Sequence, residues 1–122
     1  MRTGDQLAIV PEPTRLQDAL FAITQAGAGA AFLVDSSGVL TGIITDGDVR
    51  RALLKDRNAL DRPTSDFMSR DPLTIIGNPL AVEALAILEE SPRRPGEAPV
   101  VDSDGRPVGM VMLKDLLRCG IV

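Results

Sequence analysis

The chain has 122 residues and a formal net charge of −4; it contains no histidine and one cysteine, and 2% of its residues are aromatic. The acidic balance and the scarcity of aromatic side chains argue against nucleic acid as a partner. Without histidine or a second cysteine, disulfide frameworks, Cys/His zinc sites and imidazole-dependent triads are excluded. We therefore expect no catalytic residue, no metal site and no required cofactor. No apolar run approaches the roughly 20 residues that span a bilayer and no signal peptide opens the chain, so we expect a cytoplasmic protein without a membrane partner.

The first half of the chain alternates between strand and helix patterns. An apolar stripe at helical spacing lies at Leu16, Ala19, Leu20 and Ile23. It predicts a helix that begins at Thr14 and ends at Gly27. Apolar runs on both sides of a turn-like segment, residues 35–38, predict a β-hairpin. We expect, in chain order, a strand over 7–10, this helix, strands over 31–34 and 39–44, and a helix from about residue 46.

The second half repeats the first. The sequence VDSSG at 34–38 reappears as VDSDG at 101–105, an offset of 67, and the same offset relates Asp48 to Asp115. Upstream, DAL at 18–20 matches EAL at 83–85 with an offset of 65, so two residues are inserted between these points. Self-similarity of this kind is typical of a duplicated structural unit.

The elements expected in the second copy follow the order of the first. They are a helical turn over 66–68, a strand over 73–76, a helix over 80–89, strands over 99–101 and 108–112, and a helix over 114–118. We predict an α/β (α+β) fold of two β-α-β-β-α repeats, residues 1–57 and 66–122, joined by an internal linker over 58–65. One copy alone would bury too little surface, so the copies should pack about a pseudo-twofold axis.

The segment 42–51, GIITDGDVRR, is the strongest candidate for a site, because a buried strand runs directly into a helix. Unpaired N–H groups at a helix N-terminus bind phosphate. Gly47, next to Asp46, permits close backbone approach, and the Thr45 hydroxyl adds a hydrogen bond. Asp48 is placed to accept bonds from a ribose diol, and Arg51 supplies counter-charge.

The same residues have a purely structural interpretation. Thr45-x-x-Asp48 satisfies the capping-box pattern, in which the two side chains satisfy the helix's own N–H groups. In the second copy, Met112 replaces the capping threonine while Asp115 retains the acid. An acid kept without its capping partner favours ligand binding, although an acid near a helix start also complements the helix dipole.

These motifs resemble the CBS repeat, over nearly the whole chain. The resemblance rests on Val-Asp-x-x-Gly, on Gly-Ile-Ile-Thr-x-x-Asp, and on Asp66-Phe67-Met68 before the second copy. It implies a tandem module that binds adenosyl or other nucleotides in two clefts. Thr45 would lie near phosphate or ribose, Asp48 on ribose hydroxyls, and Asp115 in the second cleft, where Met112 departs from the family pattern.

A narrower resemblance is to the C-terminal part of bacterial arabinose-5-phosphate isomerases of the KpsF/GutQ type. It rests on the beginning RTGD, the segments TDGDVRR and LAVEAL, and the ending DLLRCGIV. It implies that an N-terminal sugar-isomerase domain is missing from this chain, and a role in supplying Kdo for lipopolysaccharide.

Three functions stay open at this point. The first is a ligand-sensing regulatory module of such an isomerase, or of a sugar nucleotidyltransferase, with an adenosyl nucleotide or a sugar nucleotide as ligand. The second is a structural module for oligomer assembly, and the third is an enzyme in its own right. Apolar helix surface left uncovered in so small a unit predicts a homodimer or higher oligomer.

Overall fold

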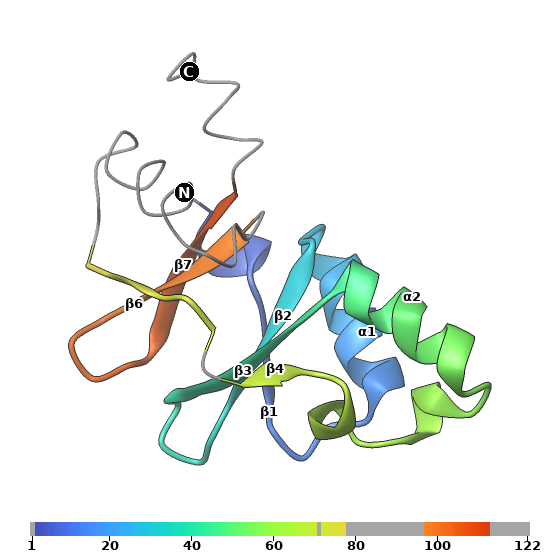
Figure 1. Ribbon diagram of the computed structural model, residues 1–122. Helices are drawn as coiled ribbons and strands as arrows, with labels where there is room; N and C mark the ends of the chain where they lie inside the picture. Colours follow the sequence, from blue (N-terminus) through green and yellow to red (C-terminus); the bar gives the residue numbers. More distant parts are fainter. Residues whose placement is uncertain (1, 71, 78–96, 113–122) are drawn as a thin grey trace.

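The computed structural model describes residues 2–70, 72–77 and 97–112 (Figure 1). The first half contains η1 (Gly4–Gln6), β1 (Ala8–Pro11), α1 (Leu16–Ala26), β2 (Ala30–Val34), β3 (Leu40–Thr45) and α2 (Asp46–Lys55). The connector and the second half contain η2 (Ala59–Asp61), η3 (Thr64–Asp66), β4 (Ser69–Arg70), β5 (Ile75–Ile76), β6 (Glu97–Val101) and β7 (Pro107–Met112). The helices predicted over 80–89 and 114–118 lie outside the described residues.

The strands form two sheets with the same pairing pattern. One has the order β1-β2-β3-β4 and the other β5-β6-β7. In each sheet the first strand pairs in parallel with the second, and the second strand pairs antiparallel with the third. Thr45 pairs with Ala30 in the first sheet and Met112 with Glu97 in the second, so the offset of 67 holds residue by residue. The mixed α/β fold and the duplication predicted from the sequence are confirmed.

The offset of 65 also has a structural counterpart. Val10 pairs with Leu33 in the first sheet, and Ile75 pairs with Val100 in the second. The first strands are therefore displaced by 65 residues while the hairpins are displaced by 67. The two additional residues lie between the first strand and the hairpin of the second copy, as the sequence predicts.

The segments that enter the two repeats are exchanged between the sheets. Ser69, near the beginning of the second repeat, pairs with Ile43 of the first. Arg2, near the beginning of the first repeat, pairs with Met110 of the second, and the N–H of each donates to the carbonyl of the other at 2.9 Å. Each repeat thereby completes the sheet of the other. The exchange adds backbone hydrogen bonds to the apolar contact between the repeats.

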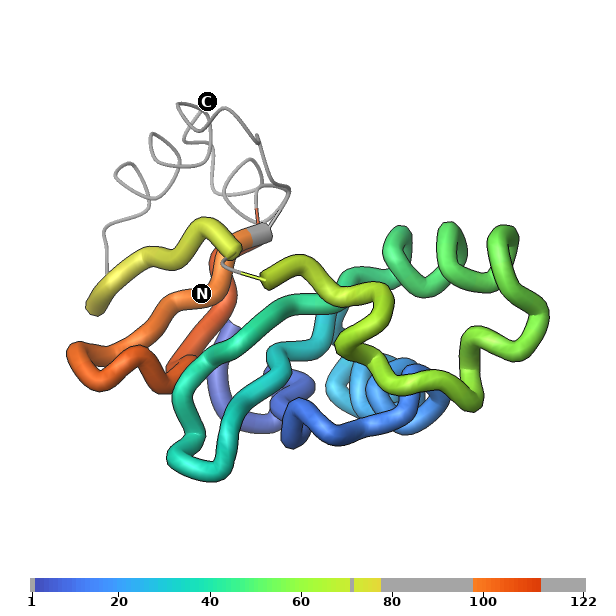
Figure 2. Tube along the Cα trace, turned by 60° about the horizontal axis from the view of Figure 1, so that its bottom comes forward, coloured from blue at the N-terminus to red at the C-terminus, as the bar shows by residue number. Residues whose placement is uncertain are grey.

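The β1–β4 sheet has one apolar face toward the helices and the other toward the β5–β7 sheet (Figures 1 and 2). Ala31, Leu33 and Ile44 pack against α1 and α2. On the opposite face, Phe32 and Ile43 pack against β7. The near-continuous apolar sequence of β2 follows from this burial on both faces.

Helix α1 begins at Leu16 and not at Thr14, so the predicted start is wrong by two residues. The Thr14 hydroxyl donates to the Pro11 carbonyl, and the Thr14 carbonyl accepts both the N–H and the hydroxyl of buried Thr64, each at 2.8 Å. Arg15 is extended at the N-cap. The connector thus holds Thr14 out of the helix. The C-terminus falls at Gly27 as predicted, in the left-handed conformation with φ of 64°.

Candidate functional site

The predicted site lies where β3 runs into α2. Gly42, Ile43 and Ile44 of β3 are buried between the two apolar layers, which fixes the end of the strand. Thr45 is extended, with φ of −103° and ψ of 165°, and is the N-cap of α2. The structure therefore brings Thr45, Asp46, Gly47, Asp48 and Arg51 together in the first turns of one helix.

The capping box of Thr45 and Asp48, which is the structural interpretation of these residues, is present. The Asp48 N–H donates to Oγ1 of Thr45 at 3.1 Å, and the Thr45 N–H donates to Oδ2 of Asp48 at 3.0 Å. The Asp46 N–H donates to the carbonyl of Gly29 at 3.0 Å. The Gly47 N–H has no acceptor among the described residues. One donor at the positive end of the helix dipole is left over.

Arg51 folds back over this helix end. Its Nη2 donates to Oδ1 of Asp48 at 2.6 Å, and the two side chains are 66% and 19% exposed. A Cβ atom at Gly47 would lie 3.2 Å from Nη1 of Arg51, so the glycine makes room for the guanidinium. Gly47 has no positive φ, so the glycine is not required by the backbone conformation here. A cation at a helix N-terminus opposes the dipole, and the Asp48 carboxylate offsets that repulsion.

Met112 occupies in β7 the register position that Thr45 occupies in β3. Its side chain is 6% exposed and packs with Met110, Phe32 and Ile43 between the sheets. A Cβ atom at Gly29 would lie 3.5 Å from Cε of Met112. Gly29 therefore lies against both strand ends. Its carbonyl accepts the N–H of Asp46, directly after β3, and its side without a Cβ atom faces Met112 at the end of β7. Sequence reasoning missed it, although the run of small residues over 27–31 is a signal of close packing. Asp115 lies outside the described residues.

Two surface pockets are lined by described residues, and neither contains the predicted site residues of the first repeat. One has a volume of about 480 Å³ and lies between the β1–α1 loop and the connector, and it includes Glu12, Arg15 and Asp61. The other, of about 530 Å³, lies between the two repeats. Within the described ranges, no three His, Cys, Asp or Glu side chains are grouped as a metal site needs. No helix described there is long and apolar enough to cross a membrane.

Among the described residues, shifted pKa values are found for Asp56, the C-cap of α2, and for Arg62 in the connector. The backbone N–H of Asn58 and then the Arg62 guanidinium, whose Nη1 is 3.2 Å from Oδ2, lower the pKa of Asp56. Hydrogen bonds to Asp56 and then Asp66 raise the pKa of Arg62. These ion pairs join the connector to the C-terminal end of α2. The guanidinium of Arg62 also lies 5.3 Å from the centre of the Phe67 ring.

Known proteins are similar to this chain over its whole length. The chain is 38% identical over 122 residues to arabinose 5-phosphate isomerase KdsD of Pseudomonas aeruginosa and 34% identical to arabinose 5-phosphate isomerase GutQ of Salmonella typhi. It spans 37% of the length of each.

Solved structures share the fold. CBSX2 of Arabidopsis thaliana, solved in complex with AMP, has a TM-score of 0.79 at 22% identity. The match covers 99% of this chain and 92% of the CBSX2 chain. The CBS-domain containing protein ATU1752 of Agrobacterium tumefaciens has a TM-score of 0.79 at 21% identity, with 93% and 84% covered. The CBS domain family matches residues 1–55 and 65–121. This chain therefore belongs to the CBS domain family and carries two copies of the domain in tandem.

Proposed function

We propose that this chain is the ligand-sensing module of an arabinose-5-phosphate isomerase of Kdo and lipopolysaccharide synthesis. The isomerases that it resembles are much longer, and the chain matches 37% of their length. The N-terminal sugar-isomerase domain would occupy the remainder. We expect the purified chain to give no interconversion of arabinose 5-phosphate and ribulose 5-phosphate above a buffer control, because its site residues form a helix cap and no acid–base pair.

The ligand class proposed for the first repeat is a nucleotide, either adenosyl or a sugar nucleotide. The observation that carries the proposal is that the Gly47 N–H has no acceptor among the described residues, while the Arg51 guanidinium lies beside the same glycine. A phosphate there would receive one backbone donor, a guanidinium and the favourable helix dipole. CBSX2, which has the same fold, is a protein solved with AMP.

Binding would require a change of partners within the cap. Arg51 would turn from the Asp48 carboxylate to the phosphate, which frees Oδ1 of Asp48 to accept a ribose hydroxyl. Oδ2 of Asp48 and Oγ1 of Thr45 would keep the capping bonds that hold the helix end in place. Asp46, which is exposed at the first position of α2, would lie at the edge of the bound ligand. Asp115 would be the corresponding acid of the second repeat.

Calorimetric titration with AMP, and separately with a sugar nucleotide, tests this site. Asp48→Ala removes the ribose acceptor, and a lost hydrogen bond to a charged group predicts affinity about tenfold to a hundredfold weaker. Asp18→Ala is the matched control, because it removes an acid of the same charge from the first turn of α1. Equal affinities of the wild type and Asp48→Ala would show that Asp48 only caps the helix.

A structural role in assembly is the second candidate, and specific observations favour it. Phe21 of α1 and Leu54 of α2 are exposed, Leu54 at 88%. A homodimer that covers these side chains would bury apolar area that the monomer leaves in water. Light scattering at tens of micromolar is expected to report the mass of a dimer, and a Leu54→Lys, Phe21→Lys variant to report a monomer. A monomeric wild-type chain would contradict the assembly role.

A further inference from the structure

The pocket of about 530 Å³ between the two repeats is separate from the nucleotide site proposed above. It lies at the beginning of β3, and Thr41 in its wall is four residues, roughly 13 Å of extended chain, from Thr45. Its other walls come from the second sheet and from the residues that enter the second repeat, namely Val101, Gly105, Arg70, Pro72 and Thr74. Its volume lies within the usual range for small-molecule sites.

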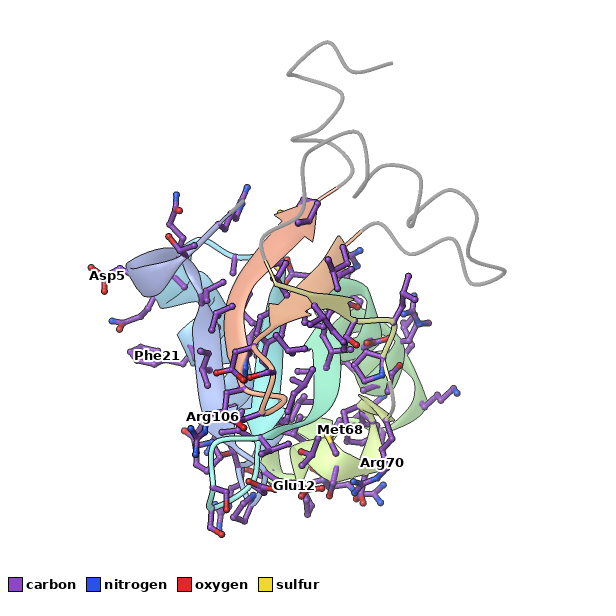
Figure 3. The ribbon with its side chains drawn as sticks, turned by 90° about the vertical axis from the view of Figure 1, so that its left-hand side faces the viewer. Asp5, Glu12, Phe21, Met68, Arg70 and Arg106 are labelled. Atoms are coloured by element: carbon purple, nitrogen blue, oxygen red, sulfur yellow. The ribbon has the colours of Figure 1, made fainter. Side chains whose placement is uncertain are left out.

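The described lining combines apolar side chains with one cationic side chain. Val39, Leu40 and Val101 supply the apolar surface. Arg70 is the one charged side chain among the described residues of the lining, and its Nη1 is 2.8 Å from Oε1 of Glu12. Both residues are labelled in Figure 3. Arg70 has no other ion pair with the described residues, so its other guanidinium nitrogens can donate to a second anion.

The hydroxyls of Thr41 and Thr74 are the remaining polar side-chain groups among the described residues of the lining. Thr41 lies at the β-bulge of β3, between the pairs Gly42–Leu33 and Leu40–Val34, and its Oγ1 donates to the Leu33 carbonyl at 3.1 Å. The donor proton of Thr41 is therefore used, while its lone pairs can still accept hydrogen bonds. Bulges commonly re-aim a side chain beside a functional site.

The pseudo-symmetry of the molecule provides an internal reference for this pocket. The three polar side chains Thr41, Arg70 and Thr74 correspond by register to Val108, Thr3 and Ile9. Two of these counterparts are apolar and none is charged, while Arg106 takes the register position of Val39. The equivalent place in the other half therefore has its cation at a different register position and has Val108 and Ile9 where this pocket has Thr41 and Thr74.

The pocket between the β1–α1 loop and the connector has the opposite character. Its described lining contains the acids Glu12 and Asp61 against one cation, Arg15. In a chain with a net charge of −4, such a lining repels anions. The pocket with Arg70 contains no described carboxylate, so it is the better of the two for an anion.

We propose that the pocket at Arg70 binds a pentose phosphate, with the phosphate on the Arg70 guanidinium and the sugar hydroxyls near Thr41 and Thr74. Arg70 exchanges Glu12 for the phosphate, which accepts stronger and more numerous hydrogen bonds than one carboxylate oxygen. The choice of sugar rests on the proposed function, because a module of an arabinose-5-phosphate isomerase is exposed to that compound. Binding itself depends only on the pocket.

Occupancy would act on the junction between the repeats. The Leu40 N–H donates to the Gly105 carbonyl at 2.9 Å, and Nε of Arg106 donates to the Ser37 carbonyl at 2.9 Å. These bonds join the two hairpins beside the pocket, where Gly105 is itself part of the lining. A ligand that contacts both hairpins would stabilise their present arrangement and would report substrate or product level to the second sheet.

The experiment is an amide NMR titration of the chain with arabinose 5-phosphate, and with arabinose as the uncharged probe. Arabinose 5-phosphate should shift the resonances of Thr41, Thr74 and Gly105 in a saturable manner, and arabinose should not. Arg70→Gln should weaken binding at least tenfold. Glu12→Gln should strengthen it severalfold, because the competing carboxylate is gone. Arg57→Gln, which removes an equal charge from the exposed segment after α2, should leave the affinity within twofold of wild type.

Opposite effects of the Arg70 and Glu12 variants separate binding from damage to the fold, since either variant breaks the same ion pair. No saturable shift, equal affinity of wild type and Arg70→Gln, or shifts at residues 45–51 would each overturn the proposal. AMP titrated into the same samples tests the nucleotide site independently. Failure of AMP with success of arabinose 5-phosphate would contradict the nucleotide site alone.

Discussion

The ends of β3 and β7 are equivalent in backbone and opposite in chemistry. At the end of β3, Thr45 is partly exposed, caps α2 and holds Asp48 through two hydrogen bonds. At the end of β7, Met112 is buried between the sheets and packs toward Gly29. One copy therefore uses this position for a polar helix cap, and the other uses it to join the repeats.

The hairpin turns show which features the duplication preserves. Oδ1 of Asp35 accepts the N–H groups of Ser37 and Val39, and Oδ1 of Asp102 accepts those of Asp104 and Arg106. The glycine that follows each turn has φ of 82° and 84°, in the left-handed region that other residues rarely adopt. Backbone requirements are thus the same in both copies, whereas the side chains at the ends of β3 and β7 have diverged.

Changing Met112 to Thr, which makes the second strand end resemble the first, should have the largest effect. Loss of most of a buried methionine should lower the free energy of unfolding by about 2–4 kcal/mol. Met112→Leu, nearly equal in volume, should cost less than about 1.5 kcal/mol. Urea unfolding followed by circular dichroism measures both. A cost below 1 kcal/mol for Met112→Thr would mean that this contact does not join the repeats.

The second prediction compares the two acids. Asp48→Ala should remove about 1.5–3 kcal/mol of AMP binding free energy, whereas Asp115→Ala should leave AMP affinity within about twofold. The reason is that only the first acid has a threonine cap beside it. The ligand-induced rise in melting temperature measures the same difference, because AMP at about 100 times its Kd adds roughly 2.7 kcal/mol of stability. Equal losses in the two variants would make the repeats functionally equivalent.

A smaller effect is expected from Thr45→Ala. Removing an N-cap side chain lowers stability by about 1 kcal/mol, because the Asp48 N–H loses its acceptor. Thr45→Ser keeps the hydroxyl and should be close to wild type in thermal unfolding. If the alanine and serine variants unfold at the same temperature, the cap contributes nothing measurable to stability.

The smallest effect concerns the connector and pH. The Asn58 N–H and Arg62 lower the pKa of Asp56 below its ordinary value of 3.8. A lowered folded-state pKa contributes stability above the unfolded value, and this contribution is lost as pH falls from 3.8 through the folded-state pKa. Asp56→Asn should therefore be slightly less stable than wild type at pH 6, with the difference shrinking below pH 3.8. A difference that does not change across this range would exclude the charge as its cause.

The sequence by itself determined the features that depend on neighbouring residues. The repeat offsets, the hairpin around Asp35, the end of α1 at Gly27 and the capping box of Thr45 and Asp48 were all predicted and are confirmed. The hairpin turn, the helix end and the capping box are each closed by hydrogen bonds or φ preferences within a few residues, so the local sequence contains their cause; the offsets follow from comparing the two copies. Which member of the capping box also binds a ligand is a separate question, and the site assignment stays a prediction.

Only the tertiary structure decided the features that join distant segments. Arg2 completes the second sheet and Ser69 completes the first. The Thr14 carbonyl accepts a hydrogen bond from the hydroxyl of Thr64, fifty residues away. The local pattern predicted a helix that starts at Thr14, and that long-range bond moved the start to Leu16. The pocket at Arg70 has walls from three segments. The geometry of such contacts is set by how distant segments pack against one another and by no local rule, so the local sequence does not contain it.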